Sequence, residues 1–211
     1  MYFYGYRQPF VFKLHFYFIN HQLAVVFMDV HQLVKEAKQG SEAAQKCLFN
    51  MLSDKMMLVC CRYLKSREDA EEILLDGFYK FFKNISSFTY QGEGALYVWL
   101  KRIMINECLM LLRKKNVFTI VTDAEVKDIP LEEEALNNLS AKEIFDLIVQ
   151  LPVGYRTVFN LYVIEGMDHK EISVLMGIAE GTSKSQLSKA KSLLQKKLLQ
   201  NGTGYVKQRS R

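Results

Sequence analysis

The sequence predicts an all-α protein with two small helical domains joined by a flexible acidic linker. Apolar residues recur at helical spacing along most of the chain, and no segment alternates as a half-buried strand does. Residues 28–115 hold 14 Lys/Arg against 11 Asp/Glu, residues 116–150 hold 2 against 8, and residues 151–211 hold 10 against 4. Two basic blocks therefore flank an acidic one, so we expect polyanionic partners for both basic blocks.

The first 27 residues differ from the rest of the chain. They hold 10 of the 26 aromatic residues and only two Lys/Arg. Polar residues interrupt their apolar run, which falls short of the about 20 residues of a membrane-spanning helix, and no small-residue cleavage site follows. We interpret residues 1–27 as a non-native or disordered extension, with translation starting at Met28; a membrane-surface anchor is the alternative.

Residues 28–115 are predicted to form the first domain. The pattern indicates one or two helices over 30–50, broken near Gly40 and capped by Ser41, and another over 56–63. Ser66 is a plausible N-cap for a helix to Lys83, whose buried side carries Ile73, Leu74, Phe78, Phe81 and Phe82. Residues 84–95 have loop composition, and a long helix follows from Leu96 to Lys115.

Residues 116–139 are predicted to be the linker, since they are acidic and contain Pro130. Ser140 with Glu143 forms a capping-box pattern that opens the second domain, residues 140–199. Pro152 suits the first turn of the next helix. Residues 200–211 have no apolar period and are expected to be a frayed basic tail.

Residues 168–198 have the pattern of a helix-turn-helix. Asp168 and Glu171 form a capping box, and Gly177 suits a left-handed helix end. Ile178 and Ala179 are expected to fill the space between the helices. In the second helix, Leu187, Ala190 and Leu194 share the inner face, and Lys184, Ser188, Lys191 and Gln195 share another. This layout favours binding in a DNA major groove; the alternative is a solvated amphipathic helix.

The remaining chemistry-bearing residues do not predict an enzyme. Cys47, Cys60, Cys61 and Cys108 form no CxxC pair, so we expect reduced thiols in a cytoplasmic protein, with zinc binding a distant alternative. The chain has no Gly-rich phosphate loop, no paired carboxylates in a catalytic setting and no nucleophile motif. We expect no metal, no cofactor and no small-molecule substrate.

Motifs in both domains together resemble one family. The first domain has Asp69-Ala-Glu-Glu-Ile with Phe78, then Trp99-Leu100, Ile103, Asn106 and Arg113. The second has Leu151-Pro152, Arg156, Phe159 and Leu161, then Glu171-Ile172, Gly177, Gly181-Thr182, Lys184-Ser185 and Leu187-Ser188. In this order and spacing, they resemble regions 2 and 4 of bacterial RNA polymerase sigma factors of the extracytoplasmic-function (ECF) group.

The resemblance implies a specificity subunit for transcription initiation that binds core RNA polymerase and directs promoter recognition. It implies that the region 2 acidic helix docks on the polymerase β′ clamp helices, with region 4 at the β flap. The residues in that docking position are Asp69, Glu71, Glu72 and Asp76. Complementing the helix dipole is an alternative role for these carboxylates.

The resemblance also implies that region 2 opens the −10 element and holds its single strand. A basic track and flat aromatic groups suit that task. The candidates are Phe88, Tyr90, Gln91, Lys101, Arg102, Asn106, Arg113 and Lys114. For Phe88 and Tyr90 a structural role is an equal alternative, and Trp99 is expected to be a core anchor.

Region 4 is implied to read the −35 element as duplex. The candidates are Thr182, Ser183, Lys184, Gln186, Ser188, Lys189 and Lys191. Arg156 and Lys170 are expected to touch phosphates or to form ion pairs. The chain departs from family habit at Leu75, Met110, Ser183, Gln186, Lys189 and Lys191, so the promoter sequence is not readable from the family.

Two further expectations concern partners. A stand-alone helix-turn-helix regulator that binds duplex DNA without polymerase is the alternative function, although such a regulator has no use for the acidic helix and basic helix of the first domain. Two domains on a linker also suit an inhibitor that covers both DNA surfaces, which in the family is an anti-sigma factor.

Overall fold

The computed structural model describes residues 29–115 and 141–208. The predicted N-terminal extension, the linker, the Ser140 cap and residues 209–211 lie outside these ranges. Every regular element within them is helical, as the sequence predicts. In the described part of the chain, no helix is long and apolar enough to cross a membrane.

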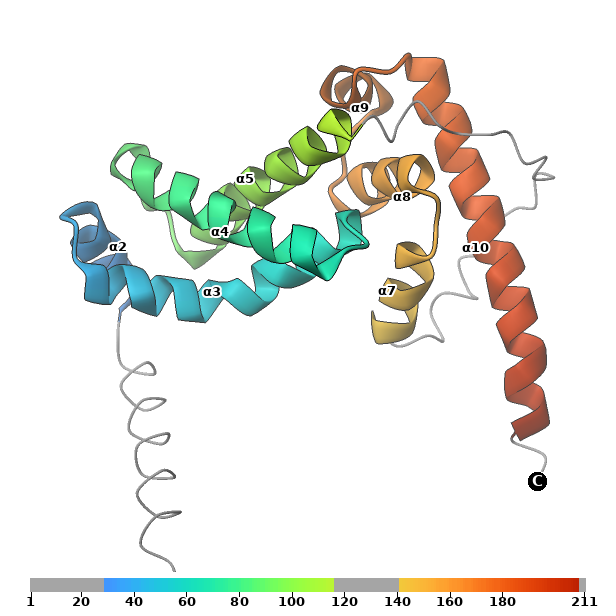
Figure 1. Cartoon of the computed structure of the whole chain (residues 1–211), viewed down its shortest axis with the longest axis horizontal. Helices are drawn as coiled ribbons and strands as arrows, with labels where there is room; N and C mark the ends of the chain where they lie inside the picture. Colours follow the sequence, from blue (N-terminus) through green and yellow to red (C-terminus); the bar gives the residue numbers. More distant parts are fainter. Residues whose placement is uncertain (1–28, 116–140, 209–211) are drawn as a thin grey trace, which may run out of the picture.

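The first domain contains four α-helices. They are α2 (Val30–Lys38), α3 (Glu42–Tyr63), α4 (Arg67–Asn84) and α5 (Glu93–Lys114), with a short 3₁₀ turn, η1 (Ile85–Ser87), after α4. Helices α3, α4 and α5 pack against one another, and α2 packs on α3 (Figure 1). Their shared core is apolar and includes the fully buried Phe81 and Leu100.

The helix starts follow the predicted caps. The Ser41 hydroxyl accepts from the Ala44 N–H at 3.3 Å, and the Ser66 hydroxyl accepts from the Asp69 N–H at 3.0 Å. The expectation of a separate helix over 56–63 is wrong, because α3 runs unbroken from Glu42 to Tyr63. Nothing in residues 51–55 breaks a helix, and Leu52 and Met56 face the same core one turn apart.

The second domain contains α7 (Ala141–Val149), α8 (Val153–Phe159), a π-helical turn η2 (Asn160–Ile164), α9 (His169–Met176) and α10 (Glu180–Gln208). Helices α8 and α9 both pack on α10. The predicted capping box is present: the Asp168 carboxylate accepts from the Glu171 N–H at 2.7 Å, and the Glu171 carboxylate accepts from the Asp168 N–H at 2.9 Å. The sequence therefore placed the helix-turn-helix correctly.

Two details of this domain differ from expectation. Helix α10 continues to Gln208, so the expectation of a frayed tail is wrong for residues 200–208. A helix that has already formed gains one hydrogen bond per added residue, so it extends without an apolar period. In the turn between α9 and α10, Ile178 is half-buried, whereas Ala179 is exposed and fills no core.

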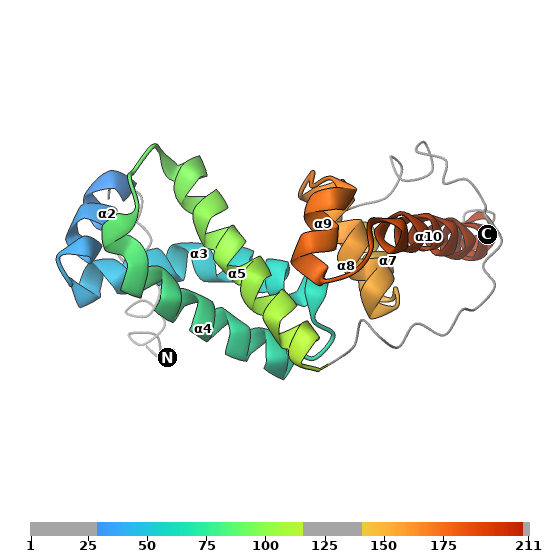
Figure 2. The same cartoon turned by 90° about the horizontal axis from the view of Figure 1, so that it is seen from above.

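The two domains are in contact. Helices α7 and α8 lie against α3, and α10 extends away from the first domain (Figures 1 and 2). The described parts of the two domains therefore form one elongated body, with the basic helices α5 and α10 in different domains.

The backbone at Gly177 supplies a stability test. Gly177 has φ 68°, in the left-handed region, so Gly177→Ala should lower the free energy of unfolding by about 1–2 kcal/mol. Gly181 lies in the first turn of α10, and a Cβ added there would meet open space, so Gly181→Ala should raise the free energy of unfolding by about 0.5 kcal/mol. Urea unfolding of the two variants measures both changes, and changes of the same sign would contradict this account of the turn.

Candidate nucleic-acid interface

The start of α10 presents a polar and cationic face to solvent. Thr182, Lys184, Ser185 and Ser188 are exposed, and Lys189 and Lys191 are half-buried. The Lys184 ammonium lies 2.7 Å from the Glu180 carboxylate, one turn before it. Five of the seven residues predicted to read the duplex thus lie where DNA has access to them.

The other two predicted duplex readers point inward. Ser183 is 0% exposed and its hydroxyl lies 2.9 Å from His169 Nδ1. Gln186 is 5% exposed and its side chain lies against Gly154 of α8. The expectation that they contact bases does not hold in this structure, because positions 183, 186 and 190 share the inner face of the helix. Gln195, also expected on the outer face, is buried for the same reason.

A second polar face lies on α5. Arg102, Asn106, Arg113 and Lys114 are all exposed, and the first three repeat at spacings that keep them on one side of the helix. Lys101 is apart from them: its ammonium lies 2.6 Å from Glu165 in the second domain, and only 23% of its side chain is exposed. Of the five predicted strand-binding residues that lie on α5, four are therefore exposed, and Lys101 is turned toward the other domain.

The two aromatic rings of the predicted loop stack on residues of neighbouring helices, α5 and α2. The Phe88 ring lies parallel to Trp99 at 4.9 Å, and the Tyr90 ring lies parallel to His31 at 4.8 Å. Trp99 also contacts Phe81 at 5.1 Å, which agrees with its predicted anchoring role. Each loop ring therefore already has one face covered, and both are half-buried, whereas Gln91 is exposed.

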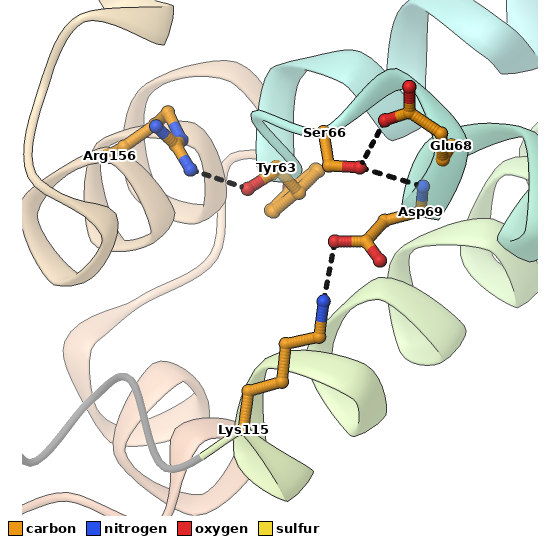
Figure 3. Close-up of polar contacts among 6 residues, drawn as sticks. All are labelled: Tyr63, Ser66, Glu68, Asp69, Lys115 and Arg156. Atoms are coloured by element: carbon orange, nitrogen blue, oxygen red, sulfur yellow. Dashed lines mark hydrogen bonds and ion pairs between the residues drawn. The ribbon is translucent and has the colours of Figure 1, made fainter.

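The acidic residues of α4 fall into two groups. Glu71 pairs with Arg67 at 2.8 Å. Asp69 pairs with Lys115 at 2.6 Å, as Figure 3 shows. Glu72 and Asp76 are exposed one turn apart. Leu75 lies between these two carboxylates in the sequence, and Tyr79 follows Asp76. Both are exposed, Leu75 by 61% and Tyr79 by 66%. Neither was predicted as a site residue. Together, Glu72, Leu75, Asp76 and Tyr79 form a mixed acidic and apolar surface suited to a protein partner.

Arg156 has a structural position that the sequence did not indicate. It is 1% exposed and donates to the carbonyl oxygens of Val149, Leu151 and Tyr63 at 2.9, 3.2 and 2.8 Å. Figure 3 shows the guanidinium reaching Tyr63 at the end of α3. The expectation that Arg156 touches phosphate or forms an ion pair is therefore wrong. Burial lowers the pKa of the Arg156 guanidinium to about 10.

Known families match both domains. The family model described as sigma-70 region 2 matches residues 48–117, and the model described as sigma-70 region 4 matches residues 135–194. The chain therefore belongs to the sigma-70 family. The match over the first domain argues against a stand-alone helix-turn-helix regulator, which needs only the second domain.

Similar proteins define the group within that family. The chain is 29% identical to the ECF RNA polymerase sigma-E factor of Haemophilus influenzae, over 79% of this chain and 93% of that one. It is 29% identical to the ECF RNA polymerase sigma factor SigW of Bacillus subtilis, over 81% and 97%. It is 27% identical to the RNA polymerase sigma-H factor of Pseudomonas aeruginosa, over 79% and 92%. This chain is an RNA polymerase sigma factor of the ECF group.

The inward position of Gln186 can be tested against its exposed neighbour. Gln186→Ala should lower the free energy of unfolding by about 2 kcal/mol, because it leaves a void beside Gly154. Lys184→Ala should change it by less than about 0.5 kcal/mol, since that side chain is solvated. Chemical unfolding of both variants makes the comparison. Equal effects on stability would place Gln186 at the surface.

Proposed function

We propose that the outward face of α10 contacts the −35 duplex through Thr182, Lys184, Ser188, Lys189 and Lys191. The observation that carries this proposal is the outward position of all five at the start of a helix that follows a capped helix and a glycine turn, three of them exposed and Lys189 and Lys191 half-buried. Lysine can reach phosphates or guanine, and hydroxyl groups can contact phosphates or base edges. Ser183 and Gln186 support this face from inside rather than contacting DNA.

The face of α5 is the proposed contact for the melted −10 strand. Arg102, Asn106, Arg113 and Lys114 supply cations and an amide for its backbone, and exposed Gln91 lies in the loop that precedes the helix. Phe88 and Tyr90 would meet a base through the side of the ring that Trp99 or His31 does not cover. Lys101 joins this track only when its pair with Glu165 is broken.

The acidic and apolar surface of α4 is the proposed contact for the β′ clamp helices. Glu72 and Asp76 supply charge, Leu75 and Tyr79 supply buried area, and Asp69 and Glu71 lie on the same helix in ion pairs. The second domain is the proposed partner of the β flap. An anti-sigma factor is a further proposed partner, because both DNA-binding faces lie on one elongated body that a single chain could cover.

Charge reversal on α4 tests the polymerase contact. Glu72→Lys with Asp76→Lys should weaken binding to core RNA polymerase at least tenfold and reduce run-off transcription accordingly, because like charges then meet at the interface. Asp54→Lys, at an exposed position on α3, is the control with the same kind of charge change and should retain binding. If the α4 variant also loses −35 duplex binding, the defect is unfolding, and the contact is not supported.

Lysine substitutions on α10 test the duplex contact. Lys184→Ala and Lys189→Ala should each cost about 1–3 kcal/mol if the lysine reads a base, or reduce the salt slope of binding by about 1 if it contacts a phosphate. Fluorescence anisotropy with labelled promoter duplex over a range of salt distinguishes these roles. Lys142→Ala, exposed on α7, should leave both quantities unchanged. Unchanged binding by the two α10 variants would move the duplex-binding surface elsewhere.

A further inference from the structure

The two domains meet at the C-terminal end of α3. The last carbonyl groups of a helix have no partner within the helix. Two of them here accept from the second domain: Tyr63 O from the Arg156 guanidinium at 2.8 Å, and Arg62 O from the Asn160 side-chain amide at 3.0 Å. Arg156 and Asn160 are both fully buried. Region 4 therefore supplies the C-terminal cap of a region 2 helix.

A carboxylate completes this junction. Glu165 lies 3.1 Å from the Arg62 guanidinium and 2.6 Å from the Lys101 ammonium, and only 7% of its side chain is exposed. Its backbone is held as well, because its N–H donates to Asn160 O at 3.0 Å and Gly166 turns the chain with φ 72°. An ion pair this sheltered is less screened by salt than a surface pair.

Glu165 forms ion pairs with two cations that could otherwise bind the phosphates of a nucleic acid. Lys101 precedes Arg102 on α5, and Arg62, in the last turn of α3, shares the Glu165 carboxylate with Lys101. A carboxylate and a phosphate oxygen make similar charge-assisted hydrogen bonds to arginine and lysine. A bound strand could replace Glu165 without leaving either cation unpaired.

We propose that Arg156, Asn160 and Glu165 hold this sigma factor in a closed state in which Glu165 takes the place of a strand phosphate on Arg62 and Lys101. The inference rests on the proposed role of Lys101 in strand binding. When only a fraction of molecules is open, the apparent affinity for the strand falls by that fraction. Single-stranded DNA and closure of the two domains therefore compete for the same two cations.

Small-angle X-ray scattering of the full chain tests the closed state. Glu165→Arg should increase the radius of gyration, because it places a third cation between Arg62 and Lys101. Adding Arg62→Glu to that variant restores one ion pair at the junction, between positions 62 and 165, and should bring the radius back toward the wild-type value. Glu180→Gln, which removes a carboxylate paired within α10, should leave the radius unchanged. A Glu165→Arg protein as compact as wild type, or a double variant as extended as the single one, overturns the proposal.

Binding of a labelled single-stranded DNA 20-mer at low salt tests whether Glu165 masks Arg62 and Lys101, that is, keeps strand phosphates from these two cations. Glu165→Gln should bind at least threefold more tightly than wild type. Glu42→Gln, at an exposed position at the start of α3 and with the same change in net charge, should not. Adding Lys101→Gln to Glu165→Gln should remove the gain. Equal affinity of wild type and Glu165→Gln overturns the masking. Glu165→Gln could bind the strand more tightly while the added Lys101→Gln does not lower that affinity. In that case the strand contact assigned to Lys101 is wrong, and Arg62 is the only cation that Glu165 keeps from the strand.

Discussion

The carbonyl end of α3 is the point on which the arrangement of this sigma factor depends. Helix ends expose acceptors that must find donors when they are buried. Here the donors come from the other domain, through Arg156 and Asn160, so satisfying α3 also fixes where α8 lies. The position of Glu165 follows, because it ends the π-helical turn that directly succeeds α8. Contact between the two domains is thus a consequence of one helix terminus.

The described basic side chains lie in environments that range from buried to fully exposed. Arg156 is buried and donates to carbonyl oxygens through its two terminal nitrogens, whereas its Nε is buried without a partner. Among the described residues, no carboxylate pairs with its charge. Arg102, Arg113 and Lys114 are exposed, where solvation makes their charge available to a phosphate backbone. Lys101 and Arg62 lie between these cases, since they are partly buried and share one carboxylate. Net charge alone would have counted all of them as equivalent.

Local patterns predicted most of the fold but not the contacts between distant segments. Ser41, Ser66, Asp168 and Gly177 act on neighbours within a few residues, so their capping roles were readable from the sequence. Ser183 and Gln186 are polar, which is typical of an exposed face, but their helical phase places them with Ala190 on the buried face. The pairing of Glu165 with Arg62 joins residues 103 positions apart, and no local period signals such a pair. The same holds for Arg156 and Tyr63, whose contact depends on how the domains meet.

Residual dipolar couplings of backbone amides in the full chain test the central claim most directly, because they report the orientation of each domain in a common frame. The account predicts that couplings from α3 to α5 and from α8 to α10 fit a single alignment tensor with the interdomain orientation described. Two tensors of different magnitude, or one tensor that requires another orientation of α8 relative to α3, would show that the end of α3 does not hold the domains together.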